Sequence, residues 1–419
     1  TGLTLRFYGP NGKWNMLFQF SLYAALVVCG CGLLYKMTTW FRYRLDIEHE
    51  HTPAQRVGAF VKGCLTTVLS RRLITLVKVV VLDVLLQVRT LRESRTRWIM
   101  HICMMYGFLA LLLLHALESY VSENLFTDYY STLSPFLLIR NLAFVLVMIG
   151  VILAVYRRSF RPPPRLMTSR ADRFMLIVLA VVMLSGFVLE GSKIVSYTSY
   201  QEMVEDYAAL DDPEDEKALA SYWSAHYGAV IPDLKAPFDA DALEAGAELH
   251  ENYCAECHSR PQWAFASYSL SRLIKPMALF LDQTGLPTIL WHVHYLACFL
   301  GLALLPFSKF LHIFTTPLSL MANAVMDDET SDPANIETRQ IMEADACTHC
   351  GACTQQCAVG VIFEGIANAS ILPSEKISLT RLLTSGQAVN GDQVRSLQSG
   401  FYLCTNCHRC TDVCPAGIN

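Results

Sequence analysis

The sequence predicts an all-α membrane protein, in which a five-helix transmembrane bundle carries one insert and a C-terminal helical domain. Apolar residues make up 53% and charged residues 17% of the 419 residues. Five stretches are apolar over the length of about 20 residues that a membrane-spanning helix needs. Ten of the fifteen cysteines fall into closely spaced groups, around position 254 and near the C-terminus. That spacing is typical of metal and haem sites rather than of disulfides.

A sixth apolar stretch, 73–88, is short and contains Lys78 and Asp83. We therefore predict a basic amphipathic helix on the membrane surface there. The five expected spans are 16–40, 98–118, 136–156, 174–192 and 287–315.

Loop charge predicts the orientation. Segment 41–97 holds eleven Lys and Arg against five acidic residues, and 157–173 holds six Arg against one Asp. Both should be cytoplasmic by the positive-inside rule. Segment 118–135 has three acidic residues and no basic one, and 192–287 has sixteen acidic and six basic residues. We expect these two segments, and the N-terminus, to be periplasmic. The C-terminus is then cytoplasmic, in a multi-pass protein of the cell inner membrane.

The same features predict the domain organisation. We expect spans one to four within 1–191, a periplasmic insert at 192–287, the fifth span within 288–325 and a cytoplasmic domain at 326–419. The chain starts at Thr1 without an initiator Met and stops four residues after Pro415, so we expect both ends to be trimmed. The formal net charge of −4 gives no indication of a nucleic-acid partner.

Two complete four-cysteine runs of the ferredoxin type lie in the C-terminal domain. Three cysteines at successive three-residue intervals wrap soft thiolate ligands around one cubane. All-cysteine zinc sites are the alternative, which two complete runs disfavour. The 46 residues between the runs suggest a helical ferredoxin domain. The fourth cysteine of each run usually serves the other cluster, so we assign one [4Fe–4S] cluster to Cys347, Cys350, Cys353 and Cys414, and a second to Cys404, Cys407, Cys410 and Cys357.

The acidic insert contains a C-x-x-C-H motif, which is a covalent haem c attachment site. Cys254 and Cys257 would bond the porphyrin, and His258 would bind the iron. A helical pattern precedes the motif, as in cytochromes c, so the insert should be a small cytochrome c-like domain. Met277 is the conventional choice for the second axial ligand. Its rivals are His250, His226 and Met203.

Histidines inside spans are costly and therefore indicate function. His101 and His115 are fourteen residues apart in the second span, and His294 and His312 are eighteen apart in the fifth. At 100° per residue each pair shares one helix face, over a rise of about 21 Å and 27 Å respectively. Because the two spans run antiparallel, His101 should be level with His312, and His115 with His294. Two bis-histidine haems b follow. The alternative is that each histidine is hydrogen-bonded to a neighbouring helix, and His292 is a helix-interface residue or a competitor of His294.

Polar side chains near the periplasmic edge are candidates for a quinone site. For each residue taken alone, the favoured interpretation is that it lies near lipid headgroups or pairs with a haem propionate, rather than that it binds a quinone. The candidates are Arg140, Glu118, Glu190 and Lys193.

The paired histidines of WIMHICMMYGFLALLLLHALE and WHVHYLACFLGLALLPFSKFLHIF resemble the gamma-subunit cytochrome b of respiratory nitrate reductases. The runs CTHCGACTQQC and CTNCHRCTDVCP resemble the dicluster domain of heterodisulfide reductases. The whole order is similar to the fused membrane subunits of heterodisulfide-reductase-like respiratory complexes. That resemblance implies menaquinone chemistry and partner subunits, which we expect to be a periplasmic multihaem cytochrome c and a cytoplasmic reductase subunit. The 192–287 insert departs from the nitrate-reductase pattern.

These sites together predict an oxidoreductase subunit. It would move single electrons between the quinone pool or a periplasmic cytochrome c and a cytoplasmic partner, through haem c, two haems b and two clusters. The first alternative is a transmembrane electron conduit without a quinone site. The second is a redox sensor whose clusters change the docking of a partner.

Overall fold

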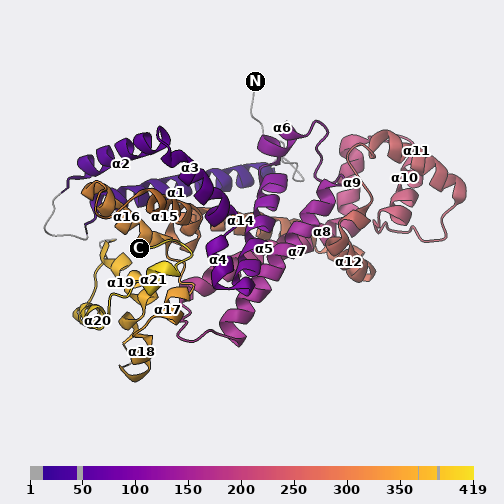
Figure 1. Cartoon of the computed structure of the whole chain (residues 1–419). Coiled ribbons are helices and arrows are strands. Elements are labelled where there is room, and N and C mark those ends of the chain that lie inside the picture. Colours follow the sequence, from indigo (N-terminus) through magenta and orange to yellow (C-terminus); the bar gives the residue numbers. More distant parts are fainter. Residues whose placement is uncertain (1–12, 45–50, 367, 385–386) are drawn as a thin grey trace. The chain divides into compact units, whose positions relative to one another are not determined.

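The protein is described from a computed structural model that covers residues 13–44, 51–366, 368–384 and 387–419. The regular elements in these ranges are all helices (Figure 1). The chain forms two compact units, and each of the long helices contributes to both. Unit 1 comprises Thr1–Tyr23, Cys103–Ile152 and Val178–Leu300, and unit 2 comprises Ala24–Ile102, Leu153–Ile177 and Gly301–Asn419.

The described residues contain five helices that are long and apolar enough to cross a membrane, which confirms the predicted number. Their residues are mostly apolar, and the charged ones lie mostly near the helix ends. Each helix can therefore satisfy its backbone groups internally in lipid. The spans are Met16–Arg42 in α1 (Lys13–Arg42), Arg95–Ala116 in α5 (Arg95–Leu111), Phe136–Phe160 in α7 (Phe136–Val155), Arg170–Val195 in α8 (Arg170–Val195) and Leu286–Phe307 in α14 (Leu286–Leu304).

The fifth span is shorter than predicted. Helix α14 ends at Leu304, two short 3₁₀ turns follow, and a new helix α15 (His312–Val325) begins at His312. Pro306 has no backbone N–H to continue the helix, and Ser308 is extended with φ −120° and ψ 179°. The expectation of one continuous helix to residue 315 was therefore wrong, and with it the 27 Å rise between His294 and His312.

The second span also departs from a regular α-helix. After α5 the chain forms a π-helical turn over Leu112–Ala116 and a second one over Glu118–Ser122. A π turn inserts one extra residue and rotates the residues after it, and such turns are frequent at functional sites. His115 lies in the first of these turns, so its direction relative to His101 differs from the direction that an unbroken α-helix would give.

The predicted amphipathic stretch 73–88 is helical as far as Leu85 and is not a candidate span. It consists of α3 (Arg72–Val79) and a π-helical segment, Val80–Leu85. Within unit 2 both pieces pack on α15. Its placement on a membrane surface stays a prediction.

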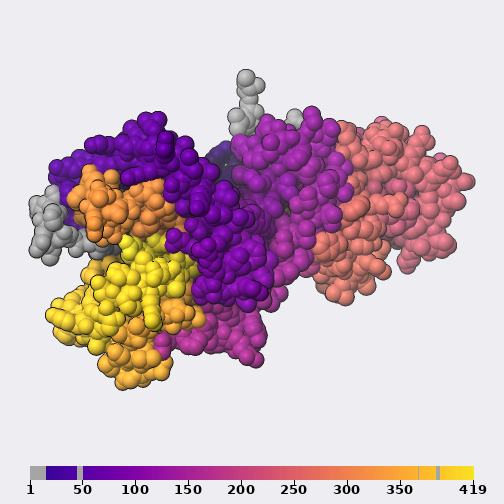
Figure 2. Space-filling model, in the orientation of Figure 1, coloured from indigo at the N-terminus to yellow at the C-terminus, as the bar shows by residue number. Residues whose placement is uncertain are grey.

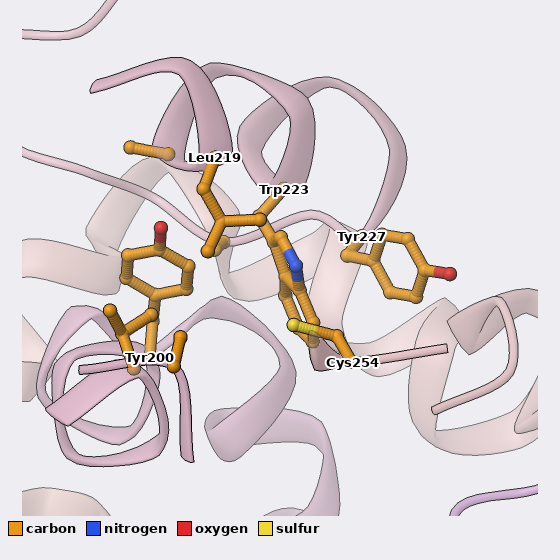
Figure 3. Packing of buried hydrophobic residues seen from close by; sticks show 9 residues of the cluster. Tyr200, Leu219, Trp223, Tyr227 and Cys254 are labelled. Atoms are coloured by element: carbon orange, nitrogen blue, oxygen red, sulfur yellow. The ribbon is translucent and has the colours of Figure 1, made fainter. Parts of the chain in front are cut away.

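The insert in unit 1 folds around helices α10 (Pro213–His226) and α11 (Ala240–Tyr253). Asp212 caps α10, and Pro213 occupies the first turn, where a missing N–H is harmless. The two helices meet closely, since a Cβ on Gly246 would clash with the carbonyl oxygen of Ala218. Their core is aromatic and includes a cysteine (Figure 3). The remaining helices of the insert are α9 (Tyr197–Tyr207), α12 (Phe265–Ile274) and α13 (Ala278–Gln283).

The C-terminal part of unit 2 is built around α16 (Pro333–Ala346). Helices α2 (Pro53–Val68), α15 and α19 (Pro373–Thr384) pack on it, so that most of its residues are buried. The fully buried Arg56 joins α2 to α16, because its Nε donates to the Thr338 hydroxyl at 2.9 Å. The short helices α17 (Ala352–Gln356), α18 (Gly360–Ile366), α20 (Gly391–Tyr402) and α21 (Arg409–Asp412) complete the domain.

Candidate functional site

The four predicted haem b histidines meet as the two predicted pairs. The first pair, His101 on α5 and His312 at the start of α15, lies in unit 2, with ring centres 6.1 Å apart. The second pair, His115 and His294, lies in unit 1, with ring centres 6.3 Å apart. Sequence reasoning paired these residues correctly, although the helices that carry them are interrupted.

Both separations fit one iron between two imidazoles. Metal–imidazole bonds are about 2 Å long and the ring centre lies about 1 Å behind the nitrogen, so two rings on one metal have centres about 6 Å apart. Rings joined by a direct N–H···N hydrogen bond would be about 1 Å closer. The histidines are carried by facing helices of a bundle, the usual place for a buried cofactor. The residues present therefore fit haem b at both positions.

The Nδ1 atoms have hydrogen-bond partners that orient the rings. In the first pair, His101 Nδ1 lies 2.9 Å from Oε1 of Gln87, and His312 Nδ1 lies 2.6 Å from the carbonyl oxygen of Lys309. A ligating histidine usually donates its second ring N–H in this way, which fixes the tautomer and leaves Nε2 for the metal. Gln87 is buried and has a left-handed backbone, with φ +52°. Sequence reasoning missed it, because a glutamine beside a helix break carries no distinctive signal.

In the second pair, His294 Nδ1 lies 3.1 Å from the carbonyl oxygen of Val182 and 3.1 Å from the Ser185 hydroxyl. That carbonyl is reachable because Gly186, one turn later on α8, has no side chain. A Cβ there would lie 2.8 Å from Cε1 of His294. Gly186 therefore makes room for the histidine, a role that the sequence alone did not reveal.

His292 has a different environment from its neighbour. Its Nδ1 lies 2.7 Å from the Thr288 carbonyl oxygen on its own helix, and its ring packs on Trp291 and Tyr295. The structure therefore places His294, and not His292, opposite His115.

The four quinone-site candidates lie in unit 1, and two of them are paired. Arg140 Nη2 lies 3.5 Å from Glu190 Oε1, and Glu190 also accepts hydrogen bonds from Asn141 and from Ser267 on α12. Arg140 interacts electrostatically with both histidines of the second pair, and Lys193 with His115. The Arg140 Nε and Glu118 Oε2 atoms are buried without a hydrogen-bond partner among the described residues. Burial raises the pKa of Glu118, against the opposing effect of Arg140.

The eight C-terminal cysteines are brought together in the predicted groups. Cys353 interacts electrostatically with Cys347, Cys350 and Cys414, and we call these four site A. Cys357 interacts with Cys404 and Cys410. The Cys407 sulfur accepts from the backbone N–H of Ala358, next to Cys357, and we call these four cysteines site B. The described residues include no three His, Cys, Asp or Glu side chains converging on a single ion. Thiolates around a cubane are more widely spaced than those around one zinc ion.

The two cluster sites differ in exposure. Site A is partly buried, and burial raises the pKa of Cys347 to about 11. In site B, Cys404 and Cys407 are exposed, and so are the residues between and after them to 409. The C-terminal residues, yellow in Figure 2, reach the surface in that view. Two cysteines of site B are therefore exposed to solvent, whereas all four cysteines of site A are partly buried.

The C-x-x-C-H motif forms a tight turn after α11. Cys254 is 5% exposed, and its sulfur lies against the indole of Trp223 (Figure 3). The His258 ring centre is 5.5 Å from that of Trp223. Burial, together with the nearby His250, lowers the pKa of His258 to about 4, which keeps the imidazole neutral as a metal ligand must be. The Cys257 carbonyl accepts a hydrogen bond from Thr132, in the loop between spans two and three. These residues fit covalent haem.

The candidate sixth ligands lie in different surroundings. Met277 is 55% exposed, in the short turn Lys275–Met277. Met203 is partly buried and packs against the core that includes Cys254. His250 is buried and lies 2.7 Å from the Tyr227 hydroxyl, whereas His226 packs on Tyr222. Met277 as the sixth ligand stays a prediction.

Residues 343–418 match the family model of the 4Fe-4S dicluster domain. The chain is 23% identical over 372 residues to an EtfAB:quinone oxidoreductase of Syntrophomonas wolfei, covering 84% of this chain and 42% of that protein.

Two further relatives are subunits of dihydromethanophenazine:CoB–CoM heterodisulfide reductases. One, from Methanosarcina thermophila, is 30% identical over 122 residues, covering 28% of this chain and 46% of that protein. A different subunit of this kind of reductase, from Methanosarcina barkeri, is 30% identical over 99 residues, covering 21% of this chain and 24% of that protein.

The expected resemblance to heterodisulfide-reductase-like membrane subunits is confirmed. The chain spans less than half the length of these three relatives. No solved structure matches it. With five spans and a dicluster domain, the protein is a membrane electron-transfer subunit with [4Fe–4S] clusters, related to oxidoreductase subunits.

Proposed function

We propose that this subunit passes electrons across the cell inner membrane in a respiratory complex. Its substrates would be the quinone pool, with menaquinone the expected quinone, or a periplasmic multihaem cytochrome c. Its cytoplasmic partner would be a heterodisulfide-reductase-like subunit. The N-terminus and the insert would be periplasmic, and the dicluster domain cytoplasmic.

The observation that carries this proposal is the pairing of histidines in both units, with ring centres 6.1 Å and 6.3 Å apart. Two haems b at these pairs, one haem c at Cys254, Cys257 and His258, and clusters at sites A and B would each exchange a single electron. The protein contributes the ligands, the hydrogen bonds that orient them and the exclusion of water. The relative named as a quinone oxidoreductase supports the quinone as one electron carrier. The relative named as a heterodisulfide reductase subunit supports the heterodisulfide-reductase-like partner.

Arg140 is the candidate quinone-binding residue that is best suited to a mutational test. Arg140 lies near the second pair, and its buried Nε has no hydrogen-bond partner among the described residues. The buried Oε2 of Glu118 also has no hydrogen-bond partner among them. A quinone carbonyl or a haem propionate can accept a hydrogen bond from the guanidinium. A protonated Glu118 can donate to a quinone oxygen, and its raised pKa favours that form.

Cofactor content is the first experiment. The purified protein should give two haems b and one haem c by pyridine haemochrome analysis, with eight iron and eight sulfide per chain attributable to clusters. Single substitutions His101→Ala and His115→Ala should each lower the haem b count by one. A wild-type count of one haem b, or no effect of either substitution, would contradict the assignment.

The transmembrane conduit without a quinone site is the second candidate. The Arg140–Glu190–Asn141–Ser267 network favours it, because it gives these polar groups a structural role between spans and insert. Reduction of the haems b by a menaquinol analogue, lost in Arg140→Ala at unchanged haem content, would establish the quinone site. Reduced haem content in Arg140→Ala would instead indicate a propionate partner, and no quinol reduction in the wild type would favour the conduit.

A further inference from the structure

Asp172 is the centre of a charged cluster in unit 2 that lies outside the predicted sites. It is 4% exposed and sits in the first turn of α8. Its carboxylate accepts hydrogen bonds from the backbone N–H and the hydroxyl of Ser169, each at 2.7 Å. The cations around it are Lys309, whose Nζ lies 2.5 Å away, and Arg158, at 3.4 Å.

One side of this cluster reaches the first histidine pair. Lys309, which Asp172 holds by its side chain, accepts the Nδ1 hydrogen bond of His312 with its backbone carbonyl. The Lys309–Leu311 turn lies in the break between α14 and α15, where the backbone is not held by a continuous helix. The ion pair with Asp172 therefore anchors the segment that orients His312.

The other side reaches cluster site A. His349, between Cys347 and Cys350, has its Nδ1 3.6 Å from Asp172 and its Nε2 bonded to Glu375 on α19. The same loop is held by Arg157, which donates to the Cys350 carbonyl at 3.1 Å. The first turn of α15 also touches this region, because the Thr315 hydroxyl donates to the Asp345 carbonyl at 3.1 Å.

We propose that Asp172 is a positioning residue shared by the first haem site and cluster site A. This inference rests on the proposed function, since it concerns how two of its cofactor sites are held. One buried carboxylate fixes both the turn behind His312 and the loop of Cys347 and Cys350. Removing its charge should therefore affect these two cofactors together and leave the others unchanged. A residue that only stabilised the fold would not show this selectivity.

The sign of the effect follows from the charges. In Asp172→Asn, Lys309 and Arg158 lose their counter-charge, and the extra positive potential favours the electron-rich, reduced form of both cofactors. The midpoint potentials of the first haem and of cluster A should rise together. In Lys309→Gln, Asp172 loses its nearest cation, and both potentials should fall. General damage to the fold would not raise the potentials in Asp172→Asn and lower them in Lys309→Gln.

The experiment is a redox titration of the purified full-length protein, following the haems b optically and the clusters by electron paramagnetic resonance. The matched control is Asp392→Asn, which removes an exposed carboxylate paired with Arg395 in the same unit. The second haem and the control should not shift. Shifts of equal sign in Asp172→Asn and Lys309→Gln, or a shift at only one of the two sites, would overturn the proposal.

Loss of the cofactors in Asp172→Asn does not end the test. Lys309→Gln and Arg158→Gln both keep the carboxylate, and both should lower the two potentials. Unchanged potentials in these variants refute the positioning role while leaving the haem and cluster assignments intact. A wild-type protein without two haems b would instead refute the proposed function itself.

Discussion

Gly186 gives the sharpest test of the second haem site. In Gly186→Ala, the new Cβ would lie 2.8 Å from Cε1 and 3.2 Å from Nδ1 of His294. Carbon atoms in contact are normally about 3.5–4.0 Å apart, so the ring or α8 has to move by about 0.7 Å or more. The ring cannot retreat freely, because its Nδ1 is bonded to Val182 and Ser185. Cofactor ligands need to be held within about 0.5 Å of their working geometry.

The expected magnitude follows from this overlap. Extra atoms in a well-packed interior cost about 1–3 kcal/mol. If that energy falls on the ligand-bound state, haem affinity drops roughly 5- to 150-fold. We expect the haem b content of Gly186→Ala to fall from two towards one, with haem c and cluster iron unchanged. Pyridine haemochrome analysis of the purified variant measures this directly.

Gly30 on α1 provides the matched control. It is also a glycine in a membrane span, but a Cβ there meets no atom within 4 Å. Gly30→Ala should keep both haems b. If Gly186→Ala also retains two haems b with unaltered potentials, His294 is not an iron ligand held in the manner described.

Three further outcomes are expected. Gln87→Leu should lower the affinity or shift the potential of the haem at the first pair only, because it removes the Nδ1 partner of His101; an unchanged optical titration would exclude that role. Met277→Leu and Met203→Leu identify the sixth ligand of haem c, because only loss of the ligand should change the haem c spectrum and potential strongly. A larger effect of Met277→Leu would support the predicted Met277, and a larger effect of Met203→Leu would favour its rival, which packs on the cysteine core. Cys357→Ser should remove the electron paramagnetic resonance signal of cluster B and leave that of cluster A, whereas loss of cluster A would show that each run binds its own cluster.

Much of the site could be predicted from sequence because its chemistry is tied to spacing. A C-x-x-C-H motif and two ferredoxin runs specify local turns, so their cysteines gather wherever the chain folds. The histidine pairs were predictable for a related reason. A span has few ionisable residues. When two antiparallel helices each carry two histidines at two levels, each histidine can pair only with the one at its own level on the other helix.

The residues that sequence reasoning missed act through tertiary contacts. Asp172 belongs to a segment rich in arginine and gives no signal of its own, yet it meets Lys309 and His349, which lie far along the chain. Gly186 matters only because His294 approaches its helix at that turn. The break after Leu304 did have a signal in Pro306, but the surrounding residues are apolar enough to continue the pattern of a span.

Helix irregularity explains how the first pair is held. In a continuous helix, the carbonyl of Lys309 would bond the backbone N–H four residues later. In the 3₁₀ turn Lys309–Leu311 this carbonyl instead accepts from both the backbone N–H and the side chain of His312. Gln87 likewise stands where the π-helical segment Val80–Leu85 has ended and α4 (Val88–Glu93) begins. Both Nδ1 partners of the first pair therefore lie at interruptions of the helices. A sequence change that repaired the break, such as Pro306→Ala, should increase helix content while weakening haem binding at this pair.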